Sequence, residues 1–120
     1  MVIGTVRIPL TPERRVELLE VLRSVKGPIE TQPGCAACHI YEEQCPESAV
    51  VLVARWESQA ALEAHIRSEV YRRVLGAIEL AAGPPEVCFE EVGASEGLEL
   101  VGRLRGRAGI NGALLRNPSR

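Results

Sequence analysis

The order of apolar and polar positions along the first thirty residues predicts a strand followed by a helix. Residues 2–8 (VIGTVRI) are rich in β-branched side chains and predict the first strand. Thr11 can cap a helix that begins at Pro12, since proline suits the first helical position. Leucine and valine residues then recur at helical spacing, and Gly27-Pro28 is expected to end the helix.

The next sixty residues predict a hairpin, a second helical region and a fourth strand. Residues 35–43 and 48–56 predict two antiparallel strands joined by a short turn. Ser58 and Ser68 are expected to cap two consecutive helical segments. Residues 86–92 predict the last strand of the sheet. The resulting order is that of the split βαβ, or ferredoxin-like, α+β fold, in which helices cover one face of an antiparallel sheet.

The predicted third strand indicates that a second copy of the chain covers the other face. Residues 50–54 are five apolar residues in succession, so both faces of this strand carry apolar side chains. One exposed face would leave a large apolar patch in water, which favours a homodimer joined sheet to sheet. Residues 97–104 predict a fifth strand or an arm that reaches toward the partner. The domain is expected to span residues 1–104, with 105–120 as a basic tail, flexible or docked on a partner.

Composition and charge exclude several classes of function. All 16 acidic residues are glutamate, which removes catalysis that needs aspartate, and no glycine-rich phosphate-binding motif is present. The net charge of −2 gives no reason to expect nucleic acid or a membrane surface as a partner. No apolar run is long enough to cross a bilayer, and Met1–Leu10 does not resemble a secretory signal, so a cytoplasmic location is expected.

The cysteines raise an alternative based on metal or haem. The sequence CAACH begins at Cys35 and matches CxxCH, the pattern of covalent c-type haem attachment. It falls on a predicted strand, where alternation would send Cys35 and Cys38 to opposite faces. Zinc held by Cys35, Cys38, His39 and Cys45 is a second option, but CxxC spacing suits a turn better than an extended strand. Buried, reduced thiols are the favoured interpretation, and Cys88 is expected in the core.

A set of short motifs resembles a known family over about residues 1–101. Pro33–Cys35 opens a strand, Arg55–Ser58 (RWES) closes the next one, and Ala61–His65 (ALEAH) and Ser68–Tyr71 (SEVY) follow. This pattern resembles the antibiotic biosynthesis monooxygenase domain family. The resemblance implies a dimeric α/β barrel in which two sheets meet face to face. Some members of that family oxidise aromatic phenols with O₂ without metal or flavin, and others degrade haem or serve other uses.

The resemblance also implies a set of site residues. Trp56 and His65 occupy positions that often line the pocket between sheet and helices in such proteins, with Trp56 stacking on a substrate ring and His65 acting as the base. Tyr41 and Tyr71 are candidates to hydrogen-bond a quinone-like oxygen, and Arg55 to stabilise a developing negative charge. The expected function is a cofactor-free monooxygenase that acts on a small phenolic or quinol compound.

Two other functions stay open at this point. The haem-degrading branch needs an axial histidine on the second helical region, where this chain has Leu75, and the low aromatic content argues against a large planar substrate. A non-enzymatic ligand-binding or structural dimer of the same fold is the first alternative. Metal or haem binding through Cys35, Cys38 and His39 is the second.

Overall fold

The computed structural model describes residues 1–44 and 48–106, and within them the predicted order of strands and helices is confirmed. The strands are β1 (Val2–Pro9), β2 (Cys35–Glu43), β3 (Ala49–Trp56) and β4 (Glu86–Glu91). The helices are the 3₁₀ turn η1 (Pro12–Arg14), α1 (Arg15–Glu30), α2 (Gln59–Ile66), α3 (Glu69–Ile78) and α4 (Leu98–Arg105). The sheet has the order β2-β3-β1-β4, and every neighbouring pair is antiparallel. This is the ferredoxin-like α+β fold, with an open sheet rather than a barrel closed within one chain.

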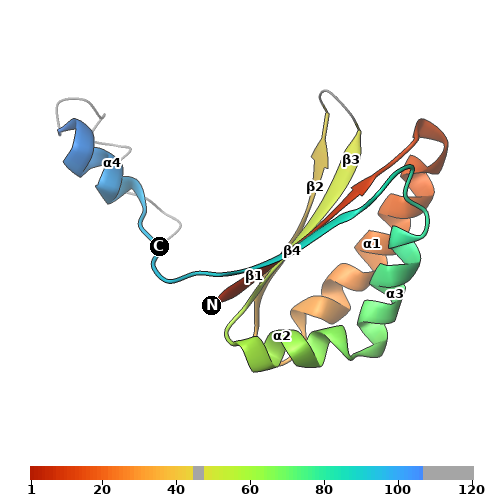
Figure 1. The fold of residues 1–120 in the computed structure, drawn as a ribbon, viewed down its shortest axis with the longest axis horizontal. Coiled ribbons are helices and arrows are strands. Elements are labelled where there is room, and N and C mark those ends of the chain that lie inside the picture. The colour runs from red at the N-terminus through yellow and green to blue at the C-terminus, as the bar shows by residue number, and fades with distance from the viewer. Residues whose placement is uncertain (45–47, 107–120) are drawn as a thin grey trace.

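The core lies between the sheet and the helices α1, α2 and α3, which all cover the same face (Figure 1). Alternate residues of β1 and β3 point into this layer, because side chains of a strand alternate between its faces. The buried strand residues include Val6, Ile8, Val50, Leu52 and Trp56. Four residues of α1 are fully buried against them: Leu18, Leu22, Val25 and Ile29.

No helix of the described ranges lies on the opposite face of the sheet (Figure 1), which we call the open face. Its side chains come from the other alternate positions, among them Ile3 and Thr5 of β1 and Val51 and Val53 of β3. All four are half-buried in the single chain. The predicted third strand thus carries apolar side chains on both faces, with the helices covering one of them.

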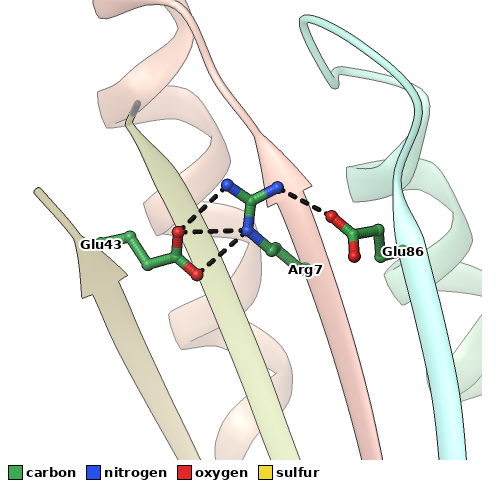
Figure 2. A network of polar contacts seen from close by, with 3 residues as sticks. All are labelled: Arg7, Glu43 and Glu86. Atoms are coloured by element: carbon green, nitrogen blue, oxygen red, sulfur yellow. Dashed lines mark hydrogen bonds and ion pairs between the residues drawn. The ribbon is translucent and has the colours of Figure 1, made fainter. Parts of the chain in front are cut away.

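Arg7 links three strands across one end of the open face (Figure 2). Its Nε donates to both carboxylate oxygens of Glu43 on β2, at 3.1 and 3.0 Å, and Nη2 donates to Oε1 of Glu43 at 3.0 Å. Its Nη1 donates to Oε2 of Glu86 on β4 at 3.0 Å. These hydrogen bonds hold the pKa of the Glu43 carboxyl below its usual value. One cation on β1 therefore connects both edge strands.

Helix α1 departs from the sequence prediction at both of its ends. The side chain of Thr11 makes no capping hydrogen bond, and the helix begins through the 3₁₀ turn that Pro12 opens. At the other end the helix continues through Gly27 and Pro28 to Glu30. The predicted stop was wrong because Ile29 is fully buried, and its burial in the core outweighs the backbone hydrogen bond that proline cannot make.

The segment 97–104 is largely helical, so the predicted fifth strand was wrong. Helix α4 stands away from the sheet at the end of an extended segment that follows β4 (Figure 1). Its residues Val101 and Leu104 are exposed. Most of the predicted basic tail lies outside the described residues, so the domain boundary stays a prediction. Every helix of the described ranges is too short or too polar to serve as a bilayer-spanning segment.

The path of α1 through Pro28 generates a stability prediction. Pro28 is exposed and lies within the last turn of the helix, where it removes a backbone donor. We expect Pro28→Ala to raise the free energy of unfolding by about 1–2 kcal/mol. A proline inside a helix destabilises it by about 3 kcal/mol, but proline also lowers the conformational entropy of the unfolded chain, which offsets part of this loss. Urea denaturation measures the change.

Gly27→Ala is the matched control for Pro28→Ala. A Cβ at Gly27 would meet nothing within 4 Å, and the alanine should stabilise the helix by about 1 kcal/mol through propensity alone. A loss of stability in Pro28→Ala would contradict the account of this helix end.

Candidate functional site

Three ring-bearing residues meet between the sheet and the helices. Trp56 ends β3, His65 lies in the last turn of α2, and Tyr71 lies in the first turn of α3. The rings of Trp56 and His65 are stacked, with centroids 4.5 Å apart and an interplanar angle of 25°. Tyr71 meets His65 edge to face, with centroids 5.1 Å apart. All three residues are buried, and together they form what we call the ring cluster.

The junction between α2 and α3 holds His65 and Tyr71 in place. Ser68 caps α3 by accepting a hydrogen bond from the backbone N–H of Tyr71 at 3.3 Å. Its hydroxyl also donates to the carbonyl oxygen of His65 at 2.6 Å. Ser58 caps α2 by accepting from the N–H of Ala61 at 3.1 Å. The two predicted serine caps are therefore confirmed, and Ser68 connects the two helices that carry the site.

Gln32 binds the imidazole from the loop between α1 and β2. Its Oε1 lies 2.6 Å from Nδ1 of His65. An amide oxygen can only accept, so Nδ1 carries the hydrogen and Nε2 keeps a lone pair. Sequence reasoning missed Gln32, because a glutamine in a loop has no periodicity or motif that relates it to a histidine 33 residues away.

A glycine allows this loop to approach α2 closely. Gly34 has a φ of +85°, and a Cβ at this position would lie 2.4 Å from the Cβ of Ala61. Backbone hydrogen bonds from Gln32 to Ile29 and from Cys35 to Gln32, both 3.1 Å long, fix the loop on either side. Only glycine combines this conformation with this contact, so Gly34 sets the distance between Gln32 and the helix that carries His65.

Burial determines the charge state of the ring cluster. His65 is only 5% exposed, and desolvation lowers the pKa of its imidazole from 6.5 to about 4. Burial likewise raises the pKa of the Tyr71 hydroxyl. Near neutral pH the site therefore presents a neutral imidazole that can accept a hydrogen bond and a protonated phenol that can donate one.

The ring cluster lines a small cavity. Its walls are Gly4, four aliphatic residues and four ring-bearing residues: Val6, Leu52, Ala54, Leu62, Trp56, His65, Tyr71 and Phe89. None of these side chains is charged at neutral pH, which suits an uncharged ligand. The volume is about 20 Å³, which is room for roughly one water molecule. An aromatic ligand can therefore enter only if a wall moves.

Two of the sequence-predicted site residues lie on the other face of the sheet. Arg55 directly follows Ala54 and precedes Trp56, both of which point to the helices, so strand alternation directs Arg55 to the open face. Tyr41 pairs with Val51 on that same face and is 54% exposed. Its ring lies near His39, with centroids 6.0 Å apart. The structure thus brings together Trp56, His65 and Tyr71 but not Tyr41 or Arg55.

In the CAACH motif, the two cysteines lie on one face of the sheet and the histidine lies on the other, whereas the sequence predicted that the cysteines point to opposite faces. A register shift between Cys35 and Ala37 interrupts the alternation of β2, so Cys35 and Cys38 both pair with residues that face the helices. The expectation that they point to opposite faces was wrong for this reason. His39 is exposed on the open face, away from both thiols. Cys35, Cys38 and His39 therefore do not share the single surface that covalent haem attachment needs.

The thiols also lack the character of metal ligands or nucleophiles. Cys38 is fully buried, and desolvation raises its pKa to about 11, while burial also raises the pKa of Cys35. Within residues 1–44 and 48–106, no group of three or more histidine, cysteine or acidic side chains is placed to hold a metal ion. Cys45 lies outside the described residues. Cys88, expected in the core, is exposed, because β4 is an edge strand and all six of its residues are exposed.

The sequence pattern of the antibiotic biosynthesis monooxygenase family matches residues 1–76, which include Trp56, His65 and Tyr71. The chain belongs to this family. A relative in Synechocystis, the uncharacterized protein sll1783, is 22% identical over 92 residues. That match covers 76% of this chain and 63% of the relative, so the chain spans less than two thirds of that protein.

Solved structures agree with the family membership at the level of the fold. A candidate antibiotic biosynthesis monooxygenase from Deinococcus radiodurans superposes with a TM-score of 0.72 at 16% identity, covering 81% of this chain and 97% of its own. Rv0793 from Mycobacterium tuberculosis gives a TM-score of 0.71 at 25% identity, covering 80% and 98%. The family fold therefore accounts for nearly the whole length of these proteins and for four fifths of this chain.

The buried imidazole generates a prediction about pH and stability. The pKa of His65 is about 4 in the folded protein, below its ordinary value of 6.5, so the unfolded chain binds more protons between these values. As the pH falls from 6.5 to 4, His65 should cost the folded protein up to about 3 kcal/mol of stability. His65→Gln should lack this component, which urea denaturation at a series of pH values measures as a difference from the wild type.

His39→Ala serves as the control, because His39 is exposed and makes no contact with the ring cluster. This variant should keep the pH dependence of the wild type. Parallel curves for the wild type and His65→Gln would contradict the assignment of a neutral imidazole at position 65.

Proposed function

We propose that the protein is a cofactor-free monooxygenase that oxidises a small, uncharged phenol with O₂. One observation carries the proposal: a neutral, oriented imidazole lines an apolar cavity together with an indole and a phenol side chain. Membership of the antibiotic biosynthesis monooxygenase family supports the reaction class. The cavity wall formed by the described residues carries no charged side chain, which favours a neutral substrate.

The proposed reaction balances without a cofactor. A phenol and O₂ give a para-quinone and water, and the four electrons that reduce O₂ come from the substrate ring. The carbon opposite the hydroxyl gains one oxygen atom. The other oxygen leaves as water with the hydroxyl hydrogen and the hydrogen displaced from the ring. The protein must bind the ring, accept the hydroxyl proton and exclude bulk water.

Each member of the ring cluster has a role in this proposal. Nε2 of His65 accepts the hydroxyl proton, since Gln32 holds the hydrogen on Nδ1. A weak base is sufficient, because a phenol becomes a strong acid as its ring loses an electron. Trp56 contacts the substrate ring, and the hydroxyl of Tyr71 donates a hydrogen bond to the developing quinone oxygen. Tyr41 and Arg55 have no role in it, since they lie on the open face.

The role of His65 is tested by substitution. We expect His65→Ala to lower kcat for O₂ uptake with a panel of monocyclic phenols by about 10²- to 10⁴-fold, the usual contribution of a general base. Mass spectrometry after reaction in ¹⁸O₂ should find one labelled oxygen atom in the quinone. His39→Ala should keep wild-type turnover, because His39 is exposed on the other face of the sheet.

Two results would count against this proposal in different ways. Equal turnover in the wild type and His65→Ala would remove His65 from the mechanism. Binding of phenols without O₂ uptake or ¹⁸O incorporation would favour the alternative of a non-enzymatic ligand-binding protein with the same fold.

We further propose that a second copy of the chain covers the open face. Proteins of this family are commonly dimeric. Ile3, Val51 and Val53 offer apolar surface at the centre of this face, while the ion pairs of Arg7 lie at one end of it. Two such faces can bury their apolar centres against each other and keep the charged ends near water.

Val53→Glu tests the dimer. A carboxylate at the centre of a buried interface would be desolvated without a partner, so the variant should sediment as a monomer at micromolar concentration while the wild type sediments as a dimer. Val16→Glu is the control, since Val16 is 63% exposed on α1 and should not affect association. A wild type that is monomeric in analytical ultracentrifugation would refute the proposal.

A further inference from the structure

The cavity is small, so an aromatic ring can enter it only where one of its walls moves. The volume of about 20 Å³ holds no aromatic ring, yet most of the surrounding side chains are tightly packed. The seven wall residues other than Gly4 and Phe89 are between 1% and 8% exposed. Phe89 is 42% exposed and is the only wall side chain with substantial access to solvent. Enlargement of the cavity therefore costs least at Phe89.

The ring of Phe89 occupies space that Gly4 leaves empty. The two residues pair across β4 and β1 and face the helices. A Cβ at Gly4 would lie 3.1 Å from both Cδ1 and Cε1 of Phe89, so the ring lies directly over the glycine backbone. This contact places the Phe89 ring against the cavity as a wall made by a single side chain.

The strand that carries Phe89 leaves it free to rotate. β4 is an edge strand, and all six of its residues are exposed. The sheet order β2-β3-β1-β4 leaves β4 paired with β1 alone, and the most extensive helix–strand contacts are those of α1 with β2 and of α2 with β3. Exposed side chains exchange rotamers in picoseconds to nanoseconds. Phe89 can therefore leave the cavity without displacing a helix.

We propose that Phe89 is the specificity-determining residue of the cavity: its ring is displaced by the substrate and limits that substrate to one aromatic ring. The inference rests on the proposed function of the ring cluster and adds the size class of its ligand. One ring leaves the wall, and one ring enters the cavity that Trp56 and Tyr71 also line. A bicyclic phenol needs more room than this exchange provides, because the displaced Phe89 ring stays attached to β4 at the edge of the cavity, and alanine at this position removes that obstruction.

Two measurements on the full chain test this role. Trp56 is the single tryptophan, so its fluorescence reports directly on the cavity. Phe89→Ala should at least double the quenching of Trp56 by acrylamide, a small neutral probe. Isothermal titration calorimetry with phenol and 1-naphthol should show the ratio of the two Kd values shifting at least tenfold toward 1-naphthol in this variant.

Val87→Ala is the matched control. Val87 lies on the same strand and the same face as Phe89 and is 44% exposed, but it does not line the cavity. Its quenching and its Kd ratio should both equal those of the wild type. Phe89→Leu, which keeps apolar contact with Gly4 but lacks a ring, should fall between the wild type and Phe89→Ala.

The outcomes separate this inference from the proposed function. If the wild type binds phenol but Phe89→Ala leaves the quenching and the Kd ratio unchanged, the role of Phe89 is overturned and the proposed cavity function stands. If neither phenol nor 1-naphthol binds any of the proteins, the proposed function fails and the size limit fails with it. An equal change in Val87→Ala would also overturn the inference, because loosening of the strand would then explain it.

Discussion

The structure depends on one constraint, which is that the helices cover only one face of a four-stranded sheet. Side chains alternate along each strand, so this one-sided cover divides the central strands β1 and β3 into residues that join the core and residues that do not. Trp56 faces the helices and becomes part of a dry site, while its neighbour Arg55 faces outward. The same constraint places Cys38 on the helix side of the sheet and His39 on the open face. The thiol and the imidazole of this haem-attachment motif therefore do not share one surface.

The exclusion of water between the sheet and the helices determines the protonation states of the ring cluster. Burial keeps the imidazole of His65 neutral and Tyr71 protonated, so the site offers one acceptor and one donor without a net charge. Gln32 fixes which imidazole nitrogen is the acceptor. Tight packing also limits the entry of a ligand, because a cavity of about 20 Å³ cannot hold an aromatic ring until one of its walls moves. Burial thus both keeps the base neutral and limits access to it.

The open face has an apolar centre, as a protein interface does, and charged groups at one end, as a solvent-exposed surface does. Apolar residues of β1 and β3 lie at its centre, and the Arg7 ion pairs with Glu43 and Glu86 lie at one end. Such pairs between partly exposed groups add little stability, but their geometry fixes how the edge strands lie relative to β1. Helix α4, which stands away from the sheet with Val101 and Leu104 exposed, adds further apolar surface to the single chain.

The sequence alone determined the order of the elements, the two serine caps and the family, because these depend on local periodicity, capping chemistry and short motifs. It also singled out Trp56, His65 and Tyr71, which the structure brings together. Tertiary structure decided what local rules could not: α1 continues through Pro28 because Ile29 is buried, and a bulge in β2 places Cys35 and Cys38 on one face. Only folding brings Gln32 to the imidazole of His65 and Phe89 to the cavity wall, because these are long-range contacts that no spacing in the chain encodes.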